Sequence, residues 1–280
     1  MTGTVNAAFE INGITFDYEG IPAIRDLSLR IERGERVVLL GANGSGKSTL
    51  LRILDGLCFP TTGAVNFAGN PLTPEGLQRN GYGLAFRRQV ALVFQNPDVQ
   101  LFNPTVFDEI AYGPLQLRWS KENVLQHVDE TLRVLGISHL KERAPYRLSG
   151  GEKKRVALAS VLVLDPEVLL LDEPTATLDP KSQSQIVDLI QQWKGTTKTV
   201  VTATHQLEIV EDIADRVLVL EAGAVIGAGT PSQILSDADL LLRANLVHAH
   251  RHSHGSVVHS HPHRHGHSHH DHEHGPSGKS

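Results

Sequence analysis

A glycine-rich segment at residues 41–49 has the residue types and spacing of a phosphate-binding loop. It reads Gly41-Ala-Asn-Gly-Ser-Gly-Lys-Ser-Thr49 and matches G-x-x-x-x-G-K-[ST], in which glycines let backbone N–H groups converge on a phosphate. In such a loop Lys47 bridges the β- and γ-phosphates and Ser48 holds Mg²⁺. The alternative is a glycine-rich turn without function, which the preceding apolar run and the following helix disfavour. The predicted nucleotide contacts are Gly41, Asn43, Gly44, Ser45, Gly46, Lys47, Ser48 and Thr49.

Two adjacent carboxylates end an apolar run farther along the chain. The run Val168-Leu-Leu-Leu-Asp-Glu173 places them at the carboxyl edge of a predicted sheet, where α/β sheets bind ligands. We expect Asp172 to support Mg²⁺ and Glu173 to polarise the attacking water as general base. An apolar run ending in Asp-Glu is by itself more often only a strand end, so this assignment depends on the glycine-rich loop. Together the two motifs predict hydrolysis of a nucleoside triphosphate.

The elements that must position these motifs are those of an α/β domain. Continuous apolar runs predict strands buried on both faces of a parallel sheet, at 37–40, 168–171 and 199–203. Helical patterns alternate with them, at 120–143, 150–164 and 181–193. Alternating apolar and polar residues predict half-buried antiparallel strands at 9–16 and 27–31. Residues 217–226 resemble a closing hairpin, and a helical lobe is expected at about 96–165, inserted in a domain that spans 1–247.

Composition limits the other classes of function. The chain has 280 residues, with 26 basic and 31 acidic residues and a net charge of −5, which excludes a chain-wide basic surface for nucleic acid. One cysteine, Cys58, excludes a disulfide framework and fits a reducing compartment. The longest apolar stretch, Val156–Leu164, has about half of the ~20 residues that a membrane helix needs. With no signal peptide in the sequence, we expect a cytosolic protein that reaches a membrane through a partner.

A third motif identifies the family that this chain resembles. Leu148-Ser-Gly-Gly-Glu152 opens a predicted helix, 20 residues before Asp172 (172 − 152 = 20). With this order of motifs, residues 9 to about 235 resemble the ATP-binding subunits of ABC transporters. The resemblance implies an α/β P-loop ABC ATPase core with a mixed sheet, an antiparallel β subdomain and an inserted helical subdomain.

The resemblance also implies roles for four further residues. Tyr18 lies where the family has its adenine-stacking aromatic, and Gln95 matches the Q-loop glutamine, a catalytic residue and Mg²⁺ ligand. Asp179 matches the D-loop aspartate, and His205 matches the switch histidine, which contacts the γ-phosphate and orients Glu173. The alternatives are strand packing for Tyr18 and a surface polar role for Gln95 and His205.

In the family, the third motif acts on a second subunit. The resemblance implies that Ser149, Gly150 and Gly151 close over ATP bound by the opposite subunit of a head-to-tail dimer, formed by two copies or with a paralogous ATPase. Glu152 stands where glutamine is more frequent. We expect little consequence, because the backbone and Ser149 carry the phosphate contact.

The segment around Gln95 points to a subgroup of the family. The run Val93–Phe102, with Gln-Asn-Pro-Asp followed by Gln-Leu-Phe, resembles the energy-coupling-factor importers, which include cobalt and nickel uptake ATPases; Thr105–Ile110 and Gly151–Val156 fit the same group. The resemblance implies integral membrane coupling and substrate-binding subunits, with this chain peripheral on the cytoplasmic face of the membrane. The alternative is that these residues only fill the junction of the lobes.

The C-terminal segment differs in composition from the rest of the chain. Of 16 histidines, 13 lie between His248 and His274, and with so few apolar residues we expect 248–280 to be disordered. Alternating imidazoles suit Ni²⁺, Co²⁺, Zn²⁺ or Cu²⁺. An inert tail and a cloning remnant are the alternatives. The predicted transition-metal ligands are His250, His252, His254, His261, His263, His265, His267 and His269.

The sequence therefore predicts an ATP-hydrolysing importer subunit that drives uptake of nickel or cobalt and uses ATP and Mg²⁺. One rival is the same type of ATPase serving a vitamin importer. Others are a non-transport ABC ATPase and a metal-storage or metal-delivery protein whose ATPase is secondary.

Overall fold

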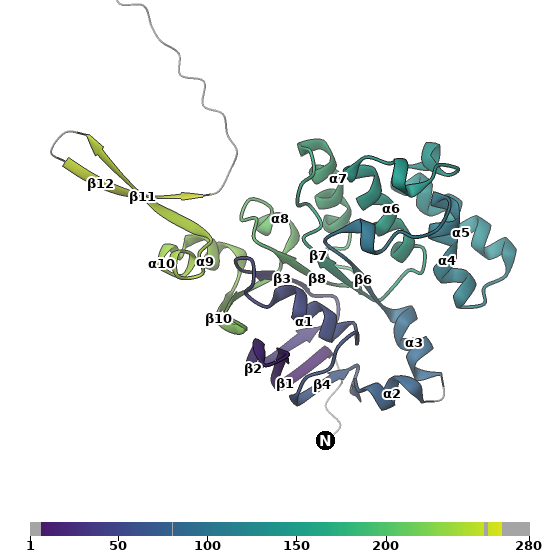
Figure 1. Ribbon diagram of the computed structural model, residues 1–280, viewed down its shortest axis with the longest axis horizontal. Helices are drawn as coiled ribbons and strands as arrows, with labels where there is room; N and C mark the ends of the chain where they lie inside the picture. The colour runs from purple at the N-terminus through teal and green to yellow at the C-terminus, as the bar shows by residue number, and fades with distance from the viewer. Residues whose placement is uncertain (1–6, 80, 255–256, 265–280) are drawn as a thin grey trace, which may run out of the picture.

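The central element of the fold is a six-stranded mixed sheet (Figure 1). The structure is a computed structural model and describes residues 7–79, 81–254 and 257–264. The strand order is β10-β9-β3-β8-β7-β6, with β10 antiparallel to β9 and all other neighbours parallel. Every residue of β3, β7 and β8 is buried, as their continuous apolar runs predict. The strands are β3 (Arg36–Leu40), β6 (Val90–Val93), β7 (Val168–Asp172), β8 (Thr199–Thr204), β9 (Arg216–Glu221) and β10 (Ala224–Gly229).

A second, antiparallel sheet is formed mainly by the N-terminal part of the chain. Its order is β2-β1-β4-β5, and Phe9 and Phe67 from this sheet share one apolar core with Leu50 of the helix that follows β3. The predicted strands at 9–16 and 27–31 are confirmed and are longer than expected. The strands are β1 (Ala7–Tyr18), β2 (Ile21–Glu32), β4 (Thr62–Phe67) and β5 (Asn70–Pro71).

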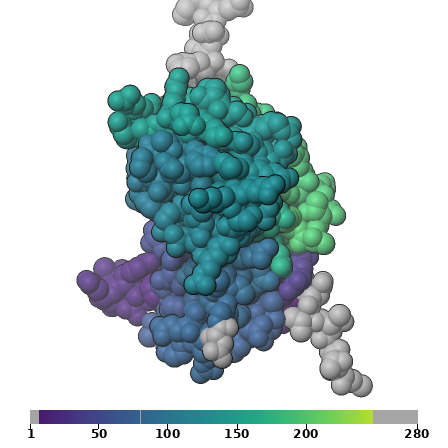
Figure 2. Space-filling view, turned by 90° about the vertical axis from the view of Figure 1, so that its right-hand side faces the viewer, coloured from purple at the N-terminus to yellow at the C-terminus, as the bar shows by residue number. Residues whose placement is uncertain are grey.

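Three helices form a lobe with its own apolar core. Ile110 of α4, Val128 of α5 and Val156 of α6 are completely buried in this core. The lobe lies directly beside the segment that carries α2 and α3 (Figure 2). The helices are α1 (Lys47–Leu54), α2 (Pro74–Gln78), α3 (Tyr82–Gln89), α4 (Val106–Gln116), α5 (Lys121–Val134), α6 (Gly150–Leu162), α7 (Pro180–Gln191), α8 (Val210–Ile213), α9 (Pro231–Ser236) and α10 (Ala238–Arg243).

The start of the histidine-rich segment differs from the sequence expectation. No regular structure is expected after residue 247, whereas β11 (Val247–His254) and β12 (Val257–Arg264) form an antiparallel pair. Pairing through backbone hydrogen bonds requires no apolar burial, so low apolar content does not by itself prevent it; an isolated hairpin is nevertheless only marginally stable in water. The predicted ligands His265, His267 and His269 lie outside the described residues.

Candidate nucleotide site at the carboxyl edge of the sheet

The glycine-rich loop connects β3 to α1 and has a backbone that only glycine fits at one position. Gly46, the N-cap of α1, has φ 102°, in the left-handed region. A Cβ atom there would lie 2.6 Å from the backbone oxygen of Ala23, so any side chain would clash as well as strain the backbone. No described side chain caps α1. The positive N-terminus of α1 is therefore presented to a ligand rather than to a capping residue.

Two side chains of this loop fit a bound phosphate. The Lys47 Nζ is buried and donates to the backbone oxygens of Gly41 and Ala42 at 2.6 and 3.0 Å. Burial lowers its pKa, and Glu173 Oε1, 3.9 Å away, opposes that shift. The Ser45 Oγ is buried without a hydrogen-bond partner among the described residues. A phosphate group would supply both the missing acceptor and a counter-charge.

Two of the three predicted magnesium ligands, Ser48 and Asp172, meet at the ends of neighbouring elements. Ser48 Oγ donates to Asp172 Oδ1 at 2.9 Å. Asp172 is buried, and burial raises its pKa, while the hydrogen bond from Ser48 opposes that shift. Gln95 is exposed and follows β6, the strand paired with β7; among the described residues it has no hydrogen bond to the other two. Hydroxyl, carboxylate and amide oxygens are ligands that suit Mg²⁺.

Glu173 is held in place by groups from several elements. His205 Nδ1 lies 2.8 Å from Glu173 Oε1, and Thr204 Oγ1 donates to Glu173 Oε2 at 3.3 Å. Both partners come from the end of β8, and the Glu173 side chain is only 4% exposed. Glu173 has φ 47°, a left-handed conformation that costs about 1–3 kcal/mol for a residue with a side chain and is concentrated at functional sites.

Lys154 belongs to this site and is missing from the sequence prediction. It is buried on α6, and its Nζ donates to the backbone oxygen of Glu173 at 2.6 Å. Burial lowers the pKa of Lys154 to about 8, opposed by the charges of Glu173 and Asp172. In the sequence it lies two residues after the motif 148–152, inside the run Gly151–Val156, whose charges look solvated and give no sign that Lys154 turns inward.

A second residue without a predicted role is Gln100. Its side-chain oxygen accepts from the Phe94 N–H at 3.2 Å, and its amide donates to the Ala157 backbone oxygen at 2.8 Å. Gln100 thereby ties the segment after β6, which contains Gln95, to α6.

Tyr18 is the last residue of β1. Its ring is 43% exposed and packs edge-on against Phe16, with ring centroids 4.9 Å apart. Arg52 of α1 donates to the Tyr18 hydroxyl at 3.3 Å. This placement leaves part of the Tyr18 side chain available to a ligand, and its contact with Phe16 fits a packing role equally well.

The third motif is organised separately from the first two. Ser149 caps α6 in a capping box with Glu152, whose carboxylate accepts from the Ser149 N–H at 2.8 Å. Asp179 caps α7 and accepts from Ser182 N and Oγ at 3.1 and 2.6 Å; these bonds lower its pKa. A Cβ at Gly151 would lie 3.1 Å from Ser182 Oγ, so the two helix starts are adjacent. Within the described residues, no hydrogen bond joins Ser149 to the glycine-rich loop.

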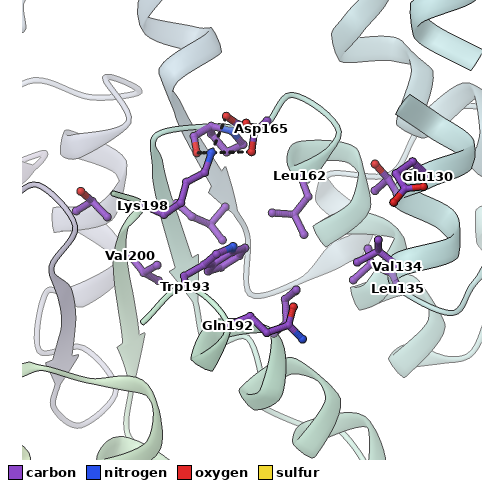
Figure 3. A pocket seen from close by; sticks show the side chains of 14 residues that line it. Glu130, Val134, Leu135, Leu162, Asp165, Gln192, Trp193, Lys198 and Val200 are labelled. Carbon is purple, nitrogen blue, oxygen red and sulfur yellow. Dashed lines mark hydrogen bonds and ion pairs between the residues drawn. The ribbon is translucent and has the colours of Figure 1, made fainter. Parts of the chain in front are cut away.

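A separate cavity of about 220 Å³ lies at the opposite, amino edge of β7 and β8, between the lobe and the core (Figure 3). Leu162 and Trp193 contribute apolar surface to it, and Lys198 pairs with Asp165 at 2.6 Å. This cavity contains none of the predicted site residues.

The mixed sheet, the phosphate loop and the carboxylate pair define a cassette-type P-loop ATPase, and the comparisons agree. Residues 24–176 match the family model described as "ABC transporter". This chain belongs to the ABC transporter family, as its ATP-binding, ATP-hydrolysing subunit.

Relatives and solved structures confirm the predicted fold class and the resemblance to energy-coupling-factor and metal-import ATPases. The nickel import ATP-binding protein NikO of Rhodobacter capsulatus is 53% identical, over 86% of this chain and 96% of that protein. The energy-coupling factor transporter ATP-binding protein EcfA2 of Methanospirillum hungatei is 44% identical, over 80% and 56%. The structure of cbiO1 from Clostridium perfringens, part of the cbiONQ complex, has a TM-score of 0.72 and 34% identity, over 86% of this chain and 95% of that one.

A further solved structure is a dimer of the ATP-binding cassette MJ0796 in a post-hydrolysis state, bound to ADP and Pi. It has a TM-score of 0.72 and 27% identity, over 80% of this chain and 98% of that one. In this chain, no helix of the described part has the length and apolar character needed to cross a membrane. The described residues also contain no group of three or more His, Cys, Asp or Glu placed to bind a metal ion.

Proposed function

We propose that this chain powers an importer of the energy-coupling-factor type that takes up a transition-metal cation, nickel or cobalt. The nickel import relative, 53% identical over nearly its whole length, carries the assignment of the cargo. The chain would act on the cytoplasmic face of the membrane, with separate membrane subunits that bind and move the cation. The solved relative cbiO1 is itself part of the transporter complex cbiONQ, which is consistent with this division.

The geometry supports a specific role for each residue of the site. Lys47 and the first-turn amides of α1 bind the phosphates of ATP, and the exposed ring of Tyr18 stacks on adenine. Ser48, Asp172 and Gln95 would hold Mg²⁺, which when bound neutralises charge on the phosphates.

Hydrolysis itself requires a base that is aligned with the water. Glu173 takes the proton of the attacking water, and His205, 2.8 Å from its carboxylate, fixes the direction of that carboxylate and faces the γ-phosphate. Gly41, Asn43, Gly44, Ser45, Gly46 and Thr49 complete the phosphate loop.

The third motif would serve a second ATPase subunit. Ser149 is exposed and has no bond to the phosphate loop of its own chain within the described residues. Ser149, Gly150, Gly151 and the neighbouring Asp179 would face ATP bound by a second copy or a paralogous ATPase. The dimeric arrangement of the cassette MJ0796 supports this proposal.

Glu173→Gln tests the catalytic assignment. The amide cannot accept the proton, so turnover should fall by about 10²–10⁴-fold, the usual contribution of a general base. ATP binding should persist, and an ATP-bound dimer should accumulate because closure precedes hydrolysis. Steady-state hydrolysis and size-exclusion chromatography measure the two effects. Glu122→Gln, an exposed residue of α5, is the matched control. Wild-type turnover in Glu173→Gln would remove Glu173 from the role of base.

Uptake experiments test the cargo. Cells that depend on this transporter and lack this chain should lose most ⁶³Ni²⁺ or ⁵⁷Co²⁺ uptake at limiting metal, and a plasmid copy should restore it. A plasmid copy with Glu173→Gln should not. Unchanged metal uptake would contradict the assignment of the cargo while leaving the ATPase assignment intact.

We further propose that the histidine-rich segment 248–280 binds the imported cation as a sink or relay after translocation. The sequence supports this through its His-x-His alternation, and the Cα register of β11 and β12 supports it by placing His248, His250 and His252 opposite His263, His261 and His259.

Truncation after Val247 tests this proposal. It should leave the ATPase intact but remove most Ni²⁺ binding in calorimetry, since 13 of 16 histidines are lost. In the full chain, binding should fall steeply below about pH 6, as imidazoles with pKa ~6.5 protonate. Full metal stoichiometry in the truncated protein at pH 7.5 would refute the proposal.

A further inference from the structure

One buried lysine connects the helix of the third motif to the backbone of the predicted base. Lys154 is on α6, five residues after Ser149, and its Nζ donates to the Glu173 backbone oxygen at 2.6 Å. It is 7% exposed. Burying an ammonium group is costly unless it is paired, so a lysine held in this position is a specific feature of the site.

The hydrogen bond from Lys154 acts on Glu173, whose backbone is already held by other bonds. Glu173 has φ 47°, and its N–H donates to the Ala203 backbone oxygen of β8 at 2.9 Å. Its backbone oxygen accepts from Lys154 on one side and from the Ala176 N–H, at 3.3 Å, on the other. The peptide groups on both sides of Glu173 are thus held, one by the sheet and one by the helical lobe. The direction of the Glu173 carboxylate depends on both.

We propose that Lys154 is a positioning residue that holds Glu173 in its left-handed conformation and thereby couples α6 to hydrolysis. This inference rests on the proposed function, in which Ser149 contacts the ATP of the second subunit and Glu173 acts on the ATP of its own. A shift of α6 as Ser149 engages one ATP is then transmitted through Lys154 to the base at the other. Each subunit aligns its own base only when its α6 is seated on the partner's nucleotide.

The test compares Lys154→Met with the neighbouring Lys153→Met. Methionine keeps the length of the side chain and removes the donor. In Lys154→Met, kcat should fall by about 10- to 100-fold, the worth of a hydrogen bond from a charged group, with KM for ATP changed less than about twofold, because the phosphate loop is untouched. Lys154→Arg, which retains a cationic donor, should recover part of kcat. The half-buried Lys153 pairs with Asp98, at 2.6 Å, and has no described bond to Glu173, so Lys153→Met should retain wild-type hydrolysis.

A second measurement separates positioning from a folding defect. Lys154→Met combined with Glu173→Gln should still form the ATP-dependent dimer and should hydrolyse no more slowly than Glu173→Gln alone, because the base is already absent. Unchanged kcat in Lys154→Met, or equal losses of kcat, nucleotide binding and dimer formation, would overturn the proposal. Full activity in Glu173→Gln alone would instead overturn the proposed role of Glu173, so the two failures are distinguishable.

Discussion

Helices α1 and α6 both follow motifs of glycine and serine, but they present their N-termini in opposite ways. Helix α1 starts behind Gly46 with no described side-chain cap, and its Lys47 is buried against the phosphate loop of the same chain. Helix α6 starts behind an exposed Ser149 with a complete capping box. Both N-termini favour anions, but only α1 is enclosed by its own chain. A phosphate bound at α6, as proposed above, would have to come from outside the chain, which is the physical reason to expect a second subunit.

The largest effect is expected from blocking the exposed helix. Ser149→Arg places a bulky side chain at the start of α6, so hydrolysis by the homodimer should fall by at least about 100-fold, comparable to loss of a transition-state donor. ATP binding by the monomer should be retained, as measured by fluorescent-nucleotide titration. Mixed dimers with wild type should lose activity at one site. Normal hydrolysis at both sites of a mixed dimer would contradict the assignment of Ser149 to the partner's ATP.

Removing the charge at the enclosed helix should affect a different step. Lys47→Ala should weaken ATP binding itself by about 10- to 100-fold, because a charge-assisted contact to phosphate is lost. Calorimetry on the monomer measures this, and Lys121→Ala, on the exposed first turn of α5, is the control. Loss of hydrolysis in Lys47→Ala with unchanged affinity for ATP would contradict the assignment of α1 to the ATP of its own chain.

A smaller effect is expected from the charge of Glu152, in the capping box of α6. Its carboxylate lies at the N-terminus of α6, and the hydrogen bonds from Ser149 lower its pKa, so it carries a negative charge where a phosphate would approach. Glu152→Gln keeps an acceptor for the cap and removes the charge. In the Glu173→Gln background, ATP-dependent dimerisation should tighten by about two- to fivefold, the usual worth of one charge at a helix terminus. Analytical ultracentrifugation measures this change, and weaker dimerisation would contradict it.

The smallest effect concerns the other end of α1. Asp55 is buried at its C-terminus, and burial raises its pKa to about 7, while nearby Arg87 opposes that shift. The folded state therefore holds a proton between about pH 4 and pH 7 that the unfolded state releases, so stability falls as pH rises through this window. Asp55→Asn removes that loss. The melting temperature of Asp55→Asn minus that of wild type should increase by about 2–4 °C from pH 6 to pH 7, measured by calorimetry. A difference in melting temperature that does not change with pH would refute this prediction.

The sheet could be predicted from sequence because its signal is local. Buried parallel strands are continuous apolar runs, and β3, β7 and β8 follow the predicted ranges to within two residues. The hairpin predicted at 217–226 is confirmed as β9 and β10. Helix α4 falls within the lobe expected at about 96–165 but not within a predicted helical pattern, the first of which begins at 120; Pro114 lies inside its last turn.

The motifs of the candidate site could be predicted from the sequence, but the residues that hold these motifs in place could not. Glycine-rich loops and paired carboxylates are recognisable from spacing alone. Lys154 and Gln100 act through tertiary contacts with backbone oxygens of distant elements, and no local pattern distinguishes a lysine that turns inward from one in a solvated charged run. The pairing of β11 and β12 depends likewise on backbone bonds that composition does not reveal.

The two tryptophans give this protein an intrinsic optical reporter. Trp119 lies 4.9 Å from the His127 ring of α5, and the Arg88 guanidinium of α3 lies 5.9 Å from its ring centroid. Trp193 lines the cavity between α5, α6 and the first residues of β8 (Figure 3). Trp119 and Trp193 are the only two tryptophans in the chain, and both lie where the lobe meets the core. Any rotation of the lobe on ATP binding would change their surroundings, so unlabelled protein can report that motion as a shift in emission.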